Sequence, residues 1–243
     1  MNIYDARTVG ERVAGNSYMG RGIVAGTSRS GGSAVAAYFI MGRSANSRNR
    51  VFAKRGGELY TEPYDPAACS DPSLIIYAAV RESGNRLIVT NGDQTDTIYD
   101  GLAAGKSFSE ALVSREFEPD APNLTPRISA MLTFADGGVS YEMSILKSVD
   151  AEGSGCCRYT FSYPSKAGLG HFIHTYMGDG QPLPTFQGEP ERVTLPDDID
   201  ELADDIWRSL DADNKISLYV RYTSLEDGSV TERIINKYGS DAK

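Results

Sequence analysis

The sequence predicts an α+β domain built from mostly antiparallel sheets, with helices packed outside them. Pairs of apolar runs separated by short polar turns indicate β-hairpins. Later segments alternate strictly between apolar and polar residues, which is typical of half-buried strands. Helical spacing is confined to a few segments. Because hairpins dominate, we expect the strands to pair antiparallel and the helices to cover the sheets.

The first predicted hairpin joins the apolar runs 22–27 and 34–41 across the flexible turn 28–32. The second of these runs, AVAAYFIM, is apolar on both faces of a strand. Such a strand must be covered on both sides, so we expect it in the centre of a sheet.

A second predicted hairpin joins the runs 74–80 and 86–90 across a Ser-Gly-Asn turn. Alternation and a final return across a turn predict further strands at 139–145, 159–163, 216–222 and 230–235. The chain is therefore expected to end in sheet.

Helices are predicted in three places. One covers 95–104, and another follows a capping box formed by Ser107 and Glu110 and runs to Phe117. The clearest helix is 197–210, where one apolar stripe and an acidic first turn occur together. The stripe consists of Ile199, Leu202, Ala203, Ile206 and Leu210.

Length and composition favour a single domain over residues 1–243, because 40% hydrophobic and 23% charged residues suit one substantial core. The longest apolar stretch is far below the ~20 residues that a membrane-spanning helix needs. Charged residues near the N-terminus argue against a secretory signal. The net charge of −9 argues against a nucleic-acid-binding surface. We therefore expect a cytoplasmic protein.

Neither the cysteines nor the histidines have the spacing of a metal site. Cys156 and Cys157 are adjacent, and we interpret the three cysteines as reduced buried thiols, with a disulfide or metal role as the alternative. His171 and His174 sit three residues apart without a third ligand at a recognisable spacing. We interpret both histidines as structural and expect neither a metal nor a cofactor.

The loop 42–50 follows the central strand and combines three arginines with small hydrogen-bonding side chains. Guanidinium groups bind phosphate through two parallel hydrogen bonds, so this loop can hold a small anionic ligand. A solvated polar turn is the alternative. The candidate ligand-binding residues, with two neighbours from elsewhere, are Arg21, Arg43, Ser44, Arg48, Asn49, Arg50 and Arg127.

A second polar segment, 90–97, lies between a predicted strand and a predicted helix. Backbone amides at the start of that helix are free to bind an anion. Asn91 and Asp96 could bind an amide or a ribose hydroxyl, and we include Gly92 and Thr95 in the same substrate-binding turn. The alternative is an ordinary Asn-Gly turn followed by a helix cap.

Two further segments combine rigidity with polar groups. Prolines brace the segment 117–128, which would hold Glu118, Thr125 and Arg127 in place. The segment 168–189 makes a structured turn between aromatic flanks and could cover a flat heterocycle. A plain connector and a cap on a sheet are the respective alternatives.

Together these segments resemble one family. GRGIVAGT, AAYFIMGRS followed by NR, the TNGxxTDTI pattern, TPRI and TYxGDGxPLP are similar to the IMP cyclohydrolase family of the stand-alone, archaeal type, in its bacterial form. The resemblance runs from about Tyr18 to Glu189 in an unbroken order of segments. Family members of archaea carry a shorter arginine loop, and the Asn49-Arg50 pair matches their shared arginine best.

The resemblance implies a four-layer αββα sandwich like that of the N-terminal-nucleophile (Ntn) hydrolases. It also implies the last step of purine synthesis, in which the 5-formamidoimidazole-4-carboxamide ribotide (FAICAR) loses water and closes to inosine monophosphate (IMP). The resemblance assigns catalytic roles to Arg50, Tyr77 and Glu118, as cation, phenol and carboxylate. From the residues alone, Tyr77 could equally be a core tyrosine and Glu118 a surface carboxylate.

Two other functions remain open at this point. One is an Ntn-type amide hydrolase, although Met1-Asn2 offers no terminal nucleophile unless a propeptide is removed. The other is a non-catalytic purine nucleotide-binding domain. For the cyclohydrolase we expect a small nucleotide substrate (FAICAR or IMP) as partner, with no nucleic acid and no membrane, and we leave a homo-oligomer open.

Overall fold

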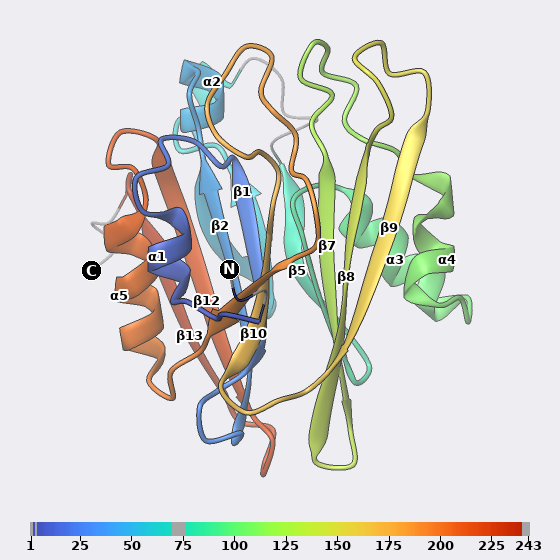
Figure 1. Cartoon of the computed structure of the whole chain (residues 1–243), viewed down its shortest axis with the longest axis vertical. Helices are drawn as coiled ribbons and strands as arrows, with labels where there is room; N and C mark the ends of the chain where they lie inside the picture. Colours follow the sequence, from blue (N-terminus) through green and yellow to red (C-terminus); the bar gives the residue numbers. More distant parts are fainter. Residues whose placement is uncertain (1, 3, 70–75, 240–243) are drawn as a thin grey trace.

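Two antiparallel sheets lie face to face in the computed structural model, which describes residues 2, 4–69 and 76–239 (Figure 1). The six-stranded sheet has the order β11-β10-β1-β2-β12-β13, with β1 Arg21–Thr27, β2 Ser33–Met41, β10 Leu169–His174, β11 Glu191–Thr194, β12 Lys215–Ser224 and β13 Val230–Asn236. The seven-stranded sheet follows sequence order, with β3 Val51–Arg55, β4 Glu58–Glu62, β5 Tyr77–Ser83, β6 Arg86–Thr90, β7 Arg127–Ala135, β8 Gly138–Ser148 and β9 Cys156–Pro164.

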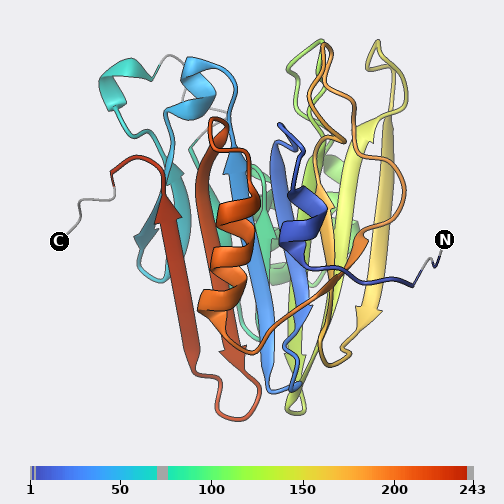
Figure 2. The same ribbon diagram turned by 60° about the vertical axis from the view of Figure 1, so that its left-hand side comes forward.

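Helices cover the outer faces of both sheets. The six-stranded sheet carries α1 (Val9–Val13) and α5 (Ile199–Ser209), and the seven-stranded sheet carries α3 (Gln94–Ala103) and α4 (Phe108–Ala111) (Figures 1 and 2). The short α2 (Ala45–Arg48) lies at one end of the sandwich. Two 3-10 turns, 66–68 and 112–114, complete the described elements. The predicted α+β class with mostly antiparallel sheets is confirmed, while kinship with the Ntn hydrolases stays a prediction.

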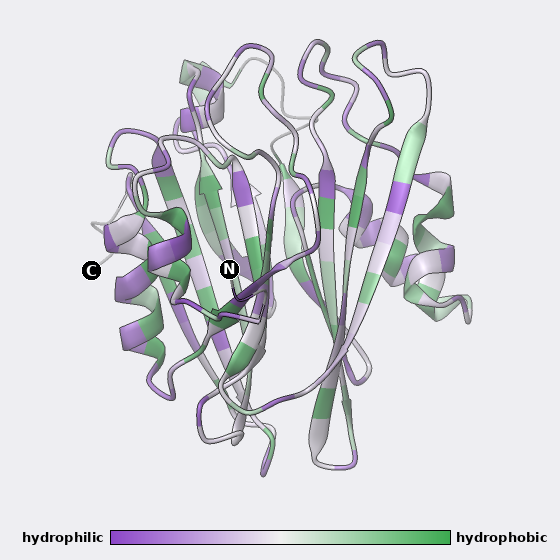
Figure 3. Ribbon diagram, viewed as in Figure 1, coloured by the Kyte–Doolittle hydropathy of each residue, from purple (hydrophilic) through white to green (hydrophobic). Residues whose placement is uncertain are grey.

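Three apolar clusters hold these layers together, and hydrophobic residues follow the strands of both sheets (Figure 3). Strand β2 serves two of the clusters because both of its faces are apolar, as predicted for a central strand. One face enters the layer between the sheets through Ala36, Tyr38 and Ile40. The other face packs toward α1 and α5 through Ala37, Phe39 and Met41.

Most predicted elements occur close to their expected bounds. The first hairpin pairs β1 with β2, and the last pairs β12 with β13. The second pairs β5 with β6, although residues 74 and 75 of its predicted first run lie outside the described residues. The capping box of Ser107 and Glu110 is present, but α4 ends after one turn and a 3-10 turn follows it.

Other elements were not predicted from the sequence. Strands β3, β4, β10 and β11 are short or lie among polar residues, so they lack a clear alternating pattern. Helix α1 is too short to show a helical period, although Thr8 and Glu11 form its capping box. The cysteine prediction is half right: all three thiols are free, but each is half-buried and not buried.

The strand directions bring several polar residues to one end of the sandwich. Arg21 begins β1, Tyr77 begins β5 and Arg127 begins β7, while β2 ends at Met41 at the same end (Figure 1). In antiparallel hairpins alternate strand ends meet at one edge, so residues distant in the sequence become neighbours there. Within the described part of the chain, no helix has the length and apolar character needed to cross a membrane.

His171 is buried between the sheets, away from that end. Its Nδ1 lies 2.7 Å from the hydroxyl of Tyr141, and the ring of Tyr163 stacks on it with centroids 3.6 Å apart. Burial, assisted by the charge of Arg192, lowers the pKa of His171 to about 4. The folded protein therefore keeps this imidazole neutral at physiological pH.

We expect stability to fall as pH drops from about 6.5 toward 4, because the unfolded chain takes up a proton on His171 that the folded chain does not. At pH 5 this linkage should cost the parent protein about 2 kcal/mol relative to pH 7.5. His171→Gln cannot take up the proton, so its free energy of unfolding should decline less over the same interval. Urea unfolding at both pH values measures the two declines, and equal declines would contradict the assignment.

Candidate active site

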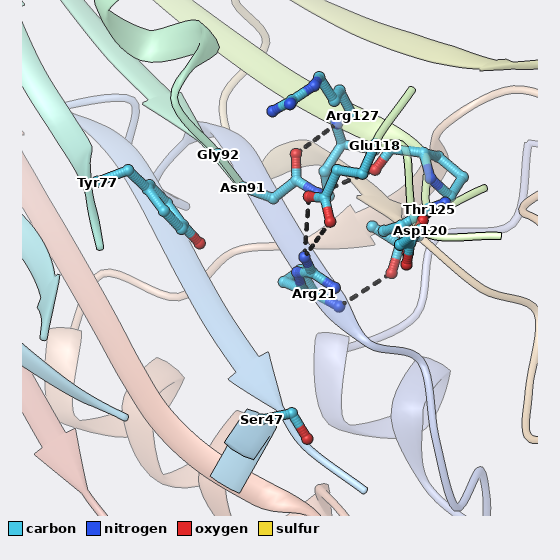
Figure 4. A network of polar contacts seen from close by, with 12 residues as sticks. Arg21, Ser47, Tyr77, Asn91, Gly92, Glu118, Asp120, Thr125 and Arg127 are labelled. Atoms are coloured by element: carbon cyan, nitrogen blue, oxygen red, sulfur yellow. Dashed lines mark hydrogen bonds and ion pairs between the residues drawn. The ribbon is translucent and has the colours of Figure 1, made fainter. Parts of the chain in front are cut away.

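A pocket of about 290 Å³ opens at the end of the sandwich where Arg21 and Tyr77 lie. It draws on the start of β1, the arginine loop, the proline-braced loop before β7 and the loop after β10. Its wall consists of Tyr18, Arg21, Arg43, Ser44, Asn46, Ser47, Arg50, Glu118, Asp120, Asn123, Thr125, Tyr176 and Leu183. Figure 4 shows several of these side chains pointing toward one another from different elements.

A buried ion pair forms the inner wall. One terminal nitrogen of Arg21 donates to both carboxylate oxygens of Glu118, at 3.0 and 3.2 Å, and both residues are less than 10% exposed (Figure 4). Burial raises the pKa of the Glu118 carboxyl, while the charges of Arg21 and Arg127 oppose that rise. The Nε of Arg21 is buried without a partner in the described structure. Glu118 is thus a carboxyl group whose proton affinity is increased by its surroundings.

Arg50 supplies a second buried guanidinium. Its Nε donates to the carbonyl of Ser47 at 2.8 Å and one terminal nitrogen donates to the carbonyl of Met41 at 3.2 Å. Burial and the nearby charge of Arg21 lower the pKa of Arg50. The buried part of the wall therefore contains two guanidinium groups and one carboxylate, which favours an anionic ligand.

Phenol groups complete the site. The hydroxyls of Tyr38 and Tyr77 lie 2.7 Å apart and join the two sheets. Tyr176 forms a short hydrogen bond with Thr125, and its ring stacks on that of Tyr18 with centroids 5.9 Å apart. The site is thus lined by aromatic rings as well as charges.

Six of the predicted site residues line the pocket: Arg21, Arg43, Ser44, Arg50, Glu118 and Thr125. Tyr77 borders it, and its hydroxyl points toward the Arg21 side in Figure 4. Arg43 forms a short ion pair with Asp179 and lies over the ring of Tyr18 at 5.0 Å, so it bridges two loops at the pocket mouth.

Two predicted residues of the arginine loop lie outside the pocket wall. Arg48 donates to the carbonyl of Gly42 at 3.0 Å and to the side chain of Asn214 at 2.9 Å. Asn49 exchanges two hydrogen bonds with the backbone of Asp65. Both side chains fix the path of the loop, which places Arg43 and Arg50.

Polar side chains of the predicted substrate-binding turn 90–97 form hydrogen bonds to other parts of the chain. Asn91 is fully buried and bonds the carbonyl of Pro126, the amide of Ile128 and the side chain of Gln94. A Cβ on Gly92 would lie 2.5 Å from the guanidinium of Arg127 and 2.6 Å from the side-chain oxygen of Gln94, so any larger residue would have to displace these two side chains. The structure therefore uses this turn to hold the start of β7 in place.

The remaining predicted residues have partners as well. Thr95 bonds the hydroxyl of Thr90 and the carbonyl of Gly92. Asp96 is exposed and pairs with Arg81 at 2.7 Å. Arg127 donates to Gln94 at 2.8 Å and pairs with Asp93 at 2.7 Å, behind the pocket wall.

Several wall residues were not predicted, notably Tyr18, Asp120 and Tyr176. The fully buried Tyr38, which bonds Tyr77, was not predicted either. Tyr38 offered one signal, because it carries a polar tip within an otherwise apolar run that is covered on both faces. No local sequence pattern indicates that Tyr77 is the partner of Tyr38, because Tyr77 lies on the other sheet.

The histidines do not form a metal site with neighbouring side chains. Nδ1 of His174 lies 2.8 Å from the carbonyl oxygen of Tyr176, and the Nδ1 of His171 faces Tyr141. Throughout residues 2, 4–69 and 76–239, no three His, Cys, Asp or Glu side chains are grouped so that they could hold a metal ion.

A larger groove, of about 400 Å³, lies between the hairpin turns at the opposite end. Its buried cation, Arg221, pairs with Glu82 at 2.6 Å and donates to Thr223, so its charge is balanced within the protein. The smaller pocket has the unbalanced buried charge and the phenol groups, and we therefore take it as the candidate active site.

Comparisons with known proteins identify the family that the chain resembles. The family model described as "IMP cyclohydrolase-like protein" matches residues 18–228. A protein of Methanopyrus kandleri named IMP cyclohydrolase is 35% identical over 146 residues, which cover 56% of this chain and 72% of the relative. Proteins of the same name from Haloquadratum walsbyi and Methanococcus aeolicus are each 28% identical, over 54% and 65% of this chain and 66% and 74% of their own lengths.

Asn91 should prove to be a structural residue. Asn91→Ala would leave the buried amide of Ile128 and the carbonyl of Pro126 without their side-chain partner, and the side-chain nitrogen of Gln94 with only the carbonyl of Ile128. We expect the free energy of unfolding to fall by roughly 2 to 4 kcal/mol. Urea unfolding measures this loss, with Asn85→Ala at an exposed turn as the control. A stable Asn91→Ala protein that has merely lost ligand affinity would contradict the structural role.

Proposed function

This chain belongs to the IMP cyclohydrolase-like family, and we propose that it catalyses the closure of FAICAR to IMP. The observation that carries the proposal is the pocket itself. Its buried wall combines two guanidinium groups, one carboxyl group of raised pKa and, at its border, a phenol. These are the groups that a dehydrative ring closure on a phosphate-bearing substrate requires.

The reaction moves protons without any change of oxidation state. The carboxamide nitrogen of the substrate forms a bond to the formyl carbon and gives up one proton, while the formyl oxygen takes up one proton and becomes a hydroxyl. That hydroxyl then takes a second proton and leaves as water, and the former formamido nitrogen gives up its proton as the new double bond forms. Two protons released and two taken up balance the loss of one water molecule.

The proposed roles follow from position and proton affinity. Burial raises the pKa of Glu118, which increases its proton affinity and suits it to exchange a proton with the reacting nitrogen. The phenol of Tyr77 can deliver a proton to the departing oxygen. Arg50 and Arg21 stabilise the negative charge that develops on that oxygen, because both guanidinium groups are already buried and oriented.

Substrate phosphate is proposed to bind at the pocket mouth. Arg43 is about one-third exposed there, and Ser44 and Ser47 contribute hydroxyl groups to the same wall. Short-range contacts of this kind can outweigh the repulsion expected from a net charge of −9, because salt screens the long-range field. A small nucleotide is thus the proposed partner. Action in the cytoplasm and assembly into a homo-oligomer stay predictions.

The direct test follows the conversion of FAICAR to IMP by absorbance, with the product identified by chromatography against authentic IMP. We expect turnover by the parent protein and a loss of roughly 10² in kcat for Glu118→Gln, since general acid–base groups typically contribute that much. Glu116→Gln is the matched control, because Glu116 is exposed and pairs only distantly with Arg158 at 3.8 Å. Binding of IMP without turnover by the parent would favour the non-catalytic nucleotide-binding alternative.

Arg43 and Arg48 offer a matched test of the phosphate site, since they belong to one loop but only Arg43 lines the pocket. We expect Arg43→Ala to weaken IMP binding by roughly ten- to a hundredfold and to leave inosine, which lacks the phosphate, nearly unaffected. Arg43→Lys should restore only part of the affinity, because lysine lacks the planar fork. Calorimetry with both ligands measures each variant.

Arg48→Ala should change the affinity for IMP and for inosine only slightly. Both changes should be much smaller than the loss of IMP affinity in Arg43→Ala. Equal losses for IMP and inosine in Arg43→Ala would mean that Arg43 contacts the base or orders the loop, and would refute the phosphate assignment.

A further inference from the structure

We propose that Tyr38 is a positioning residue. Its hydroxyl donates a hydrogen bond to the oxygen of Tyr77, so that the proton of Tyr77 points toward the substrate. This inference rests on the proposed function, in which Tyr77 exchanges a proton during ring closure. It assigns to the opposite sheet a residue that acts on the reaction through another side chain.

The contact itself joins the two sheets. Tyr38 lies on β2 in the centre of the six-stranded sheet, and Tyr77 is the first residue of β5 in the seven-stranded sheet. Their hydroxyl oxygens are 2.7 Å apart, which is the usual length of a strong hydrogen bond between hydroxyls. The ring of Tyr38 is fixed by packing against Phe52, with centroids 5.4 Å apart. The packing of Tyr38 therefore holds its hydroxyl in place beside the hydroxyl of Tyr77.

Burial decides which hydroxyl donates. Tyr38 is 0% exposed, and its hydroxyl has no other hydrogen-bond partner within the part of the chain that the structure describes. If Tyr77 donated, the proton of Tyr38 would be left buried and unpaired, which is costly. Tyr77 is 5% exposed and borders the pocket, so its own proton can reach water or substrate. The favoured arrangement is thus donation from Tyr38 to Tyr77.

Nearby charges suit this arrangement. Arg21 and Arg50 interact electrostatically with both phenols, so positive charge lies near the oxygen that gives up its proton in the proposed reaction. Burial and the adjacent Tyr77 raise the pKa of Tyr38 well above its usual range, so Tyr38 stays a neutral donor. A hydrogen bond that strengthens as Tyr77 becomes a phenolate lowers the barrier and leaves substrate binding unchanged.

The chain provides a matched control on the neighbouring strand. Tyr219 of β12 is the register partner of Tyr38, faces the same layer between the sheets and is 1% exposed. Its hydroxyl donates to Glu232 at 2.5 Å, and among the described residues no hydrogen bond joins it to Tyr38 or Tyr77. Tyr219→Phe therefore removes an equally buried hydroxyl from the same sheet without touching Tyr77.

The test measures kcat and KM for the conversion of FAICAR to IMP. We expect Tyr38→Phe to lower kcat roughly tenfold with KM nearly unchanged, because one hydrogen bond is lost in the transition state. Tyr219→Phe should keep the parental kcat and KM. Tyr38→Phe added to Tyr77→Phe should cause no further loss.

Parental kcat in Tyr38→Phe would overturn the inference. A tenfold further loss in the double variant would also overturn it, because Tyr38 would then act independently of Tyr77. Should Tyr38→Phe fail to fold, replacing Tyr38 by a fluorinated tyrosine, a stronger donor, should raise kcat with KM unchanged, and an unchanged kcat would overturn the inference. An inactive parent protein would refute the proposed function instead, so the two failures are distinguishable.

Discussion

The ion pair of Arg21 and Glu118 is the constraint on which the site depends. Removing two charged groups from water is expensive, and their attraction offsets that cost only when geometry and further hydrogen bonds are good. Here Arg21 begins a central strand, while Glu118 belongs to a stiff loop that leads into the other sheet. The pair therefore fixes the two sheets relative to each other at the end where the pocket opens, and the loss of either partner would leave a buried charge uncompensated.

Hydrogen-bonded side chains around the pocket explain how the ion pair of Arg21 and Glu118 is held in place. Asn91, Gln94 and Arg127 bond the start of β7 and the turn before α3, so the loop that carries Glu118 leaves the sheet in one direction. On the other side, Arg48 and Asn49 fix the arginine loop through Asn214 and Asp65. These residues are buried or partly buried polar groups whose hydrogen bonds are made within the protein. They support the pocket from behind while other side chains form its wall.

The sequence could predict the hairpins, the central strand and the clearest helix, because each is marked by a local pattern of apolar residues. Three of the four segments singled out from the sequence contribute residues to the pocket wall, whereas 90–97 lies behind it. The sequence could not show that Arg43 lines the pocket and Arg48 does not, because a run of polar residues does not reveal which side chains turn inward. Nor could it reveal the contact of Tyr38 with Tyr77, because 39 positions separate them and only the stacking of the sheets brings them together. Short strands such as β11 escaped prediction for lack of a measurable period.

The pocket residues differ in whether they sit on strands or on loops. Arg21, Tyr38 and Tyr77 sit on strands, and their contacts cross between the sheets, so they cannot move without disturbing the core. Arg43 and Thr125 sit on loops, and their contacts with Asp179 and Tyr176 join one loop to another. In the proposed function, a ligand phosphate would replace the carboxylate of Asp179 at Arg43 without altering any contact between the sheets. Binding would then rearrange the pocket mouth, while the groups proposed to exchange protons keep the geometry that catalysis needs.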